Sequence, residues 1–66
     1  MKVVTFDISS SEFVIYTENA WNAQLQEWRE ELYHAAEIEE ALEWDEEDVV
    51  EAMCGDEFFY EKVESL

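Results

Sequence analysis

Carboxylates crowd one stretch of this 66-residue chain, EIEEALEWDEEDVVEAM, at residues 37–53. Eight of the twelve residues from 37 to 48 are acidic, and none of the twelve is basic. Side chains of this type can transfer protons, bind cations or face the positive groups of a partner. The first two uses need further residue types at suitable spacing, so the rest of the sequence decides among the three.

A catalytic use of these carboxylates has little support elsewhere in the chain. His34 is the only histidine, and no serine or cysteine near it in the sequence suggests a nucleophile and its base. We therefore expect no enzyme activity and no catalytic residues.

Metal binding is not expected either. His34 and Glu37 could share one helix face, but a metal site needs several convergent ligands and the chain has no second histidine. The acidic run lacks the spaced, glycine-containing loop of a calcium site. Cys54 has no CxxC partner for redox chemistry and is expected to be a small buried side chain. We expect no metal and no cofactor.

The charge balance favours the third use. Nineteen acidic residues against three basic ones give a net charge of −16. Such a chain repels phosphates and anionic membranes, so we expect a basic partner and no direct contact with nucleic acid or membrane. The longest apolar run, FVIY, is too short to span a membrane, and no apolar signal segment follows Lys2. With a single cysteine, these features predict a cytoplasmic protein.

A small fold must position these side chains. Sixty-six residues allow one domain, and 48% hydrophobic content supplies a core. In VVTFDIS, Val4, Phe6 and Ile8 alternate with polar residues and are expected to form the buried face of a strand. Residues 12–17, EFVIYT, are expected to form a second strand, joined to the first by a hairpin at residues 9–12. The ends of that loop also match a helix capping box, but the hairpin is favoured.

The apolar spacing then changes to that of a helix. The residues on one helical face are Trp21, Leu25, Trp28, Leu32 and Ala35. Thr17 or Asn19 could cap the start of this helix. Continuing the same phase would bury Glu39, so we expect the helix to end or kink within residues 34–38. A separate apolar face follows at Ile38, Ala41 and Leu42.

The motif WDEEDV predicts that another helix begins at Glu46. Asp45 is placed to cap this helix, with Asp48 as the reciprocal partner. Trp44 and Val49 are spaced to pack against each other across the cap. The acidic residues of the first turn also complement the helix dipole.

The C-terminal part predicts a helix end and one further element. Gly55 suits a helix end, where a left-handed conformation is common. The segment EFFYEKVESL fits either a helix or a third strand, and the strand is favoured. The expected fold is α+β, with an N-terminal β-hairpin, two or three short helices and this last element, in one compact domain over residues 1–66.

The charge pattern itself is unfavourable for a helix. Like-charged pairs at i, i+4 are Glu27–Glu31, Glu39–Glu43, Glu43–Glu47 and Glu47–Glu51. Each pair costs about 0.2–0.5 kcal/mol, whereas a surface that serves solubility alone usually mixes both signs. Eight charges over twelve helical residues give roughly one charge per 2 Å, close to the value of about 1.7 Å for duplex DNA. The run therefore has the charge spacing of a phosphate backbone.

In size, net charge and its acidic segments EIEEALEWDEED and GDEFFYEKVE, the chain resembles a class of small acidic DNA-mimic inhibitors. Phages and mobile elements encode these proteins, which include anti-restriction, anti-CRISPR and uracil-DNA glycosylase inhibitor proteins. They share no single fold or motif, so no residue role is carried over from them. The resemblance implies occupation of the nucleic-acid site of a host defence or DNA-processing protein, in the host cytoplasm if the chain is phage-encoded.

The carboxylates expected to contact the partner are Glu37, Glu39, Glu40, Glu43, Asp45, Glu46, Glu47, Asp48, Glu51, Asp56 and Glu57. Two alternatives use the same sequence differently. In one, an adaptor module binds another protein through an exposed aromatic patch, and the charge serves solubility and partner choice. In the other, an acidic and aromatic segment folds only on its partner.

Overall fold

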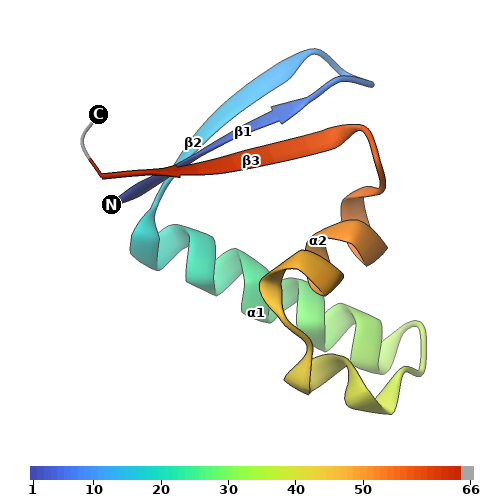
Figure 1. Ribbon diagram of the computed structural model, residues 1–66. Helices are drawn as coiled ribbons and strands as arrows, with labels where there is room; N and C mark the ends of the chain where they lie inside the picture. The colour runs from blue at the N-terminus through green and yellow to red at the C-terminus, as the bar shows by residue number, and fades with distance from the viewer. Residues whose placement is uncertain (65–66) are drawn as a thin grey trace.

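The computed structural model describes residues 1–64, in which a three-stranded sheet lies against a layer of helices (Figure 1). In chain order the elements are β1 (Lys2–Asp7), β2 (Glu12–Thr17), α1 (Glu18–His34), the 3-10 helix η1 (Glu39–Glu43), α2 (Glu46–Cys54) and β3 (Phe58–Val63). The predicted α+β fold is therefore confirmed, including the hairpin at its start and the strand at its end.

The sheet has the order β2-β1-β3, and both pairs of strands are antiparallel. The Asp7 carboxylate accepts hydrogen bonds from the Ser9 backbone N–H at 2.9 Å and the Ser9 hydroxyl at 2.6 Å, which stabilises the turn. Ser11 takes the positive φ of 56° that closes the turn. The hairpin thus forms in place of the capping box that the same residues could have made.

The two faces of the sheet are covered differently. All helices lie on one side, here called the inner face, and the opposite side is the outer face (Figure 1). On the inner face of β1, Val3 is fully buried and Thr5 is 2% exposed, with the Thr5 hydroxyl donating to the Val14 carbonyl at 3.0 Å. Val4 and Phe6 point the other way and remain partly exposed. The predicted buried face of β1 is therefore wrong.

The route of the chain after the hairpin explains this inversion. Thr17 ends β2 and is also the N-cap of α1, where its hydroxyl accepts from the Ala20 backbone N–H at 3.2 Å. With no linker between strand and helix, α1 turns back directly under the face that carries Tyr16 and Val3. The position of the covering helix, rather than the apolar alternation of β1, therefore decides which phase of the strand is buried.

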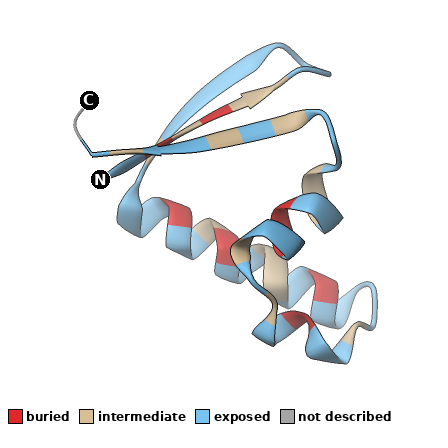
Figure 2. Cartoon of the chain, viewed as in Figure 1, coloured by how far each residue is buried: buried red, intermediate tan, exposed pale blue. Residues whose placement is uncertain are grey.

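The core lies between the inner face and the helices (Figure 2). Its buried residues are Val3, Trp21, Leu25, Val49 and Val50. The Trp21 ring is 1% exposed and lies 5.3 Å from Tyr16, 5.4 Å from Tyr60 and 5.9 Å from Trp28, measured between ring centroids. Trp21 therefore connects the sheet to the helix layer.

The first helix ends where the buried face would have met an acidic residue. α1 stops at His34, and Glu37 takes a positive φ of 58° before η1 begins. Leu32 is buried as predicted, but Ala35 is exposed because the helix has already ended there. In η1, Ala41 is fully buried while Leu42 is 43% exposed, so the predicted apolar face there is only partly formed.

The second helix begins at Glu46 and ends before Gly55, which has a φ of 76°, as predicted. Asp45 occupies the N-cap position, but its carboxylate makes no capping hydrogen bond, so the predicted capping box is wrong. Trp44 is half-buried against the core cluster that includes Val49. The local sequence sets the start of this helix without the expected side-chain cap.

The third strand, β3, pairs with β1, and its aromatic residues alternate between the faces. Phe58 and Tyr60 pack against the core on the inner face, whereas Phe59 is 55% exposed on the outer face. Across residues 1–64, no helix combines the length and the apolar character needed to cross a membrane.

Candidate functional site

Ten of the eleven carboxylates predicted to contact a partner are exposed. They are Glu37, Glu39, Glu40, Glu43, Asp45, Glu47, Asp48, Glu51, Asp56 and Glu57. We call residues 37–57 the acidic segment. It runs through η1, the corner at Trp44 and Asp45, α2, and the turn that leads into β3.

The acidic segment does not form one continuous helix. Ile38 and Asp45 have extended backbones that flank η1, and α2 begins only at Glu46. The charge spacing predicted for a single α-helix is therefore wrong. A 3-10 helix rises about 2.0 Å per residue against about 1.5 Å for an α-helix, so the charges follow a bent path with unequal spacing. Of the like-charged pairs in this segment, only Glu47–Glu51 lies within one α-helix.

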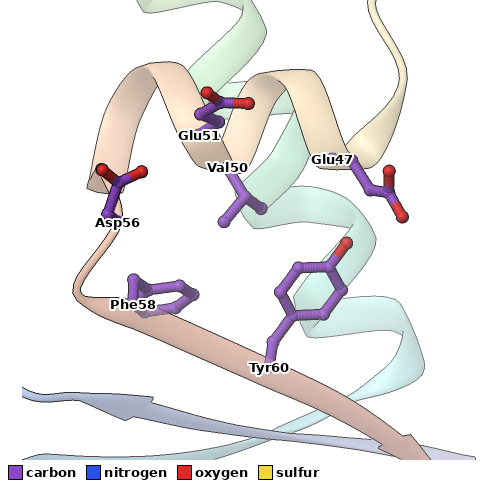
Figure 3. Close-up of a pocket in the computed structure, with 7 residues that line it drawn as sticks. Glu47, Val50, Glu51, Asp56, Phe58 and Tyr60 are labelled. Atoms are coloured by element: carbon purple, nitrogen blue, oxygen red, sulfur yellow. The ribbon is translucent and has the colours of Figure 1, made fainter.

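An open groove lies between α2 and β3 (Figure 3). Val50 projects from α2 toward the rings of Phe58 and Tyr60, which form the apolar floor. The carboxylates that line this groove are Glu47, Glu51 and Asp56, and within residues 1–64 no basic side chain lines it.

The chemistry of this groove suits the side chain of a lysine or an arginine. Such side chains lay their aliphatic stem on apolar surface while the charged head stays near water. An aromatic face attracts the cation further, and carboxylates within reach form charge-assisted hydrogen bonds with it. The groove offers both kinds of contact within one short stretch of α2 and β3.

Glu46 differs from the ten exposed carboxylates because it is bound within the fold. Its Oε1 accepts a hydrogen bond from the indole N–H of Trp21, and its Oε2 lies 3.0 Å from the Lys62 ammonium. One carboxylate thus joins the first residue of α2 to α1 and to β3. Its position indicates a role in holding the helix layer on the sheet.

The pKa of Glu46 follows from these contacts. Partial burial by itself would raise it, but the hydrogen bonds donated by Trp21 and Lys62, with the Lys62 charge, hold this pKa below its ordinary value. Burial, and then the charges of Glu46 and Glu47, raise the pKa of Tyr60. At neutral pH the carboxylate is therefore ionised and the phenol keeps its proton.

Arg29 shows a similar internal use of a charged group. Its Nε–H donates to the Trp44 carbonyl at 3.0 Å, which ties α1 to the corner between η1 and α2. Of the three basic residues, Arg29 and Lys62 therefore hold the helix layer together and to the sheet.

The described part of the chain contains no cluster of side chains suited to a metal ion. Within residues 1–64, no three histidine, cysteine or acidic side chains are placed to hold a metal ion. The His34 ring lies edge-on to Tyr33, with 4.9 Å between ring centroids. Cys54 is a free, half-buried thiol rather than a fully buried one, and burial raises its pKa.

Sequence reasoning missed two features of the surface. The groove floor of Val50, Phe58 and Tyr60 comes from two elements whose packing no local pattern reveals. The exposed outer face of the sheet was also missed, although the run FVIYT is apolar in both strand phases and so could have signalled it. Comparisons with protein-family models, curated protein sequences and solved structures give no match to this chain.

Proposed function

We propose that this protein is a DNA mimic that inhibits a basic nucleic-acid-binding protein by occupying its nucleic-acid site. One observation carries the proposal. The only ion pair among residues 1–64 uses Glu46 and Lys62, so the ten exposed carboxylates of the acidic segment have no cation of their own chain beside them. Their mutual repulsion costs stability in a small domain, and a basic partner would remove it.

The exposed carboxylates act in place of phosphates, opposite the lysines and arginines of the target. The bent path of the acidic segment presents them from η1, from α2 and from the turn before β3. The groove between α2 and β3 gives one lysine or arginine an apolar floor as well as charge. The proposed target is a host defence or DNA-processing protein, and the proposed setting is the cytoplasm, that of the host cell if the chain is phage-encoded.

A capture and competition experiment tests the proposal. The full chain is immobilised and exposed to a host-cell lysate, and any retained protein is challenged with duplex DNA. We expect a basic nucleic-acid-binding protein that duplex DNA releases. We also expect its retention to fall at least about tenfold between about 50 and 200 mM salt, as phosphate-type contacts do.

Charge reversals locate the contact. Changing Glu47 and Glu51 to lysine should abolish retention, because attraction is replaced by repulsion at the groove. The matched control changes Glu12 and Glu18 to lysine, which alters the net charge equally outside the acidic segment and should weaken retention far less. Circular dichroism confirms that both variants fold. Simultaneous binding of DNA and this protein to the target, or equal losses in the two variants, would contradict the proposal.

A second candidate function rests on a different surface. The outer face of the sheet exposes large apolar side chains, including 70% of Phe13 and 55% of Phe59. An adaptor module could bind a protein target there, with the charge serving solubility and partner choice. Retention that persists at high salt and is lost on changing Phe59 to glutamate would favour this function over the DNA mimic.

A further inference from the structure

The outer face of the sheet forms one apolar band across all three strands. Directly paired residues of antiparallel strands share a face, so the register defines its members. They are Val4, Phe6, Phe13, Ile15, Phe59 and Val63. Phe6 pairs with Phe13 on one side and with Phe59 on the other, and the Phe6 and Phe13 rings lie 4.6 Å apart.

No helix of the described chain covers this band. The helices lie on the inner face alone (Figure 1), and β2 is exposed along almost its whole length (Figure 2). More than half of the residue surface is exposed at Phe13, Ile15 and Phe59. A sheet normally buries an apolar face against a second layer, and this sheet has that layer on one side only.

The band is also the part of the sheet that carries little charge. Lys2 and Glu61 are the charged residues that the register places on the outer face, and their charges cancel. The carboxylates of the acidic segment lie in the helix layer and in the turn before β3, away from the middle of the band. Two molecules of net charge −16 would repel each other at most other contacts.

We infer that the outer faces of two copies of this chain pack against each other in a symmetric dimer. The two apolar bands would form a sheet-on-sheet core of about 10 Å spacing, and the helix layers with their acidic segments would lie on opposite outsides. A basic partner would bind the acidic segment instead, because the band carries one carboxylate and one ammonium and therefore has no net charge. The inference does not depend on the proposed function.

The size of the band sets the strength of this dimer. Phe13 and Phe59, at 70% and 55% exposure, present roughly 190–310 Å² between them if each aromatic side chain has about 150–250 Å². Ile15, which is 53% exposed, and the less exposed residues of the band add to this area. Specific interfaces bury at least about 600 Å² per partner, so this band supplies a small interface. We therefore expect a weak dimer whose population depends on concentration.

Sedimentation velocity of the full chain, from about 5 to about 500 µM, measures the dimer. We expect the mass to rise from that of a monomer toward that of a dimer. The dimer should be at least about tenfold tighter at about 500 mM than at about 50 mM salt, because salt screens the repulsion between the two negative chains. A monomer at every concentration, or growth beyond a dimer, would overturn the inference.

Two variants distinguish this face from other contacts. Phe59→Glu places a carboxylate in the band and should weaken the dimer at least about tenfold. Leu42→Glu makes the same charge change at a similarly exposed apolar residue of η1 and should leave the dimer intact. Phe59 lies on β3, so a dimer formed through the free edge of β2 would survive Phe59→Glu, and that result would contradict the proposed face.

A measurement on the unmodified chain covers the case in which Phe59→Glu does not fold. Amide NMR spectra recorded over the same concentration range should shift for residues of the three strands and stay unchanged for α2. Shifts confined to α2, or none at all while the mass doubles, would exclude the outer face as the interface. Because the acidic segment takes no part in this contact, the DNA-mimic proposal can fail without affecting the result.

Discussion

The inner and outer faces of the sheet are built from the same three strands and from similar residues, yet they differ in almost every physical respect. The inner face carries Val3 and Thr5, both nearly inaccessible, and Trp21 of α1 packs on it. The outer face carries Phe13 and Phe59, which are mostly exposed. The alternation of β1 alone would bury Val4 and Phe6, whereas the direct connection from β2 to α1 places the helix over Val3 and Thr5 and buries them instead.

The two faces also differ in electrostatics. The helix layer over the inner face contains most of the acidic segment, and Glu46 binds this layer to β3 through Lys62. The outer face carries one positive and one negative side chain, Lys2 and Glu61. Salt should therefore act in opposite directions on the two surfaces. It should weaken attachment of a basic partner to the acidic segment and strengthen apolar contact through the outer face.

The largest expected difference is between truncating a buried aromatic residue under the inner face and truncating an exposed one on the outer face. Trp21→Ala removes a ring that is 1% exposed and should cost about 3–5 kcal/mol of unfolding free energy, comparable to the whole stability of a domain this small. Phe13→Ser, at a residue that is 70% exposed, should cost less than about 1 kcal/mol in dilute solution. Urea unfolding followed by circular dichroism measures both. Equal costs would mean that the outer face is covered in the monomer.

A smaller effect is expected for Glu46, the carboxylate that binds the helix layer to the sheet. Glu46→Ala leaves the buried Trp21 indole N–H without its acceptor and should cost about 1–3 kcal/mol. The control Glu47→Ala removes the same charge at the adjacent, exposed position and should be neutral or slightly stabilising, because it relieves repulsion.

The pH dependence of the Glu46→Ala cost identifies its cause. The pKa of Glu46 in the folded chain is lower than its ordinary value of 4.5. Its charge-dependent contribution is therefore fully present above pH 4.5 and is lost as the pH falls through the lowered pKa. The difference between wild type and Glu46→Ala should shrink over that acidic range, since protonation of the exposed acids affects both proteins. A difference that is constant from neutral pH to pH 3 would show that the ionised carboxylate is not the cause.

The smallest effect compares the starts of the two helices that cover the inner face. Thr17→Ala should cost about 0.5–2 kcal/mol, because the Thr17 hydroxyl accepts a hydrogen bond from the Ala20 N–H. Asp45→Ala should cost less than about 0.5 kcal/mol, since its carboxylate makes no such bond and its loss relieves repulsion. Thermal melts of the two variants provide the comparison. An equal cost would indicate that Asp45 caps α2 in solution.

Local features of the sequence were enough to predict most boundaries of the helices and strands. The hairpin, the end of α1, the start of α2 at Glu46 and the end before Gly55 all follow from residues a few positions apart, and Thr17 was one of two candidates for the N-cap of α1. The exposure of most acidic residues was likewise predictable, because an unpaired charge is costly to bury. These properties depend on the spacing of neighbours along the chain, which the sequence states directly.

Tertiary packing decided the rest. In β1, the packing buries Val3 and Thr5 rather than Val4 and Phe6. It binds the Glu46 carboxylate to Trp21, so that Glu46 is not part of the exposed acidic surface. It also places Val50 beside Phe58 and Tyr60 in the groove. Each of these outcomes depends on contacts between residues far apart in sequence. The alternation of β1 favours burial of Val4 and Phe6, and only the packing of α1 on the other side reverses this. In the sequence Glu46 does not differ from its acidic neighbours, and only the fold places Trp21 and Lys62 beside it.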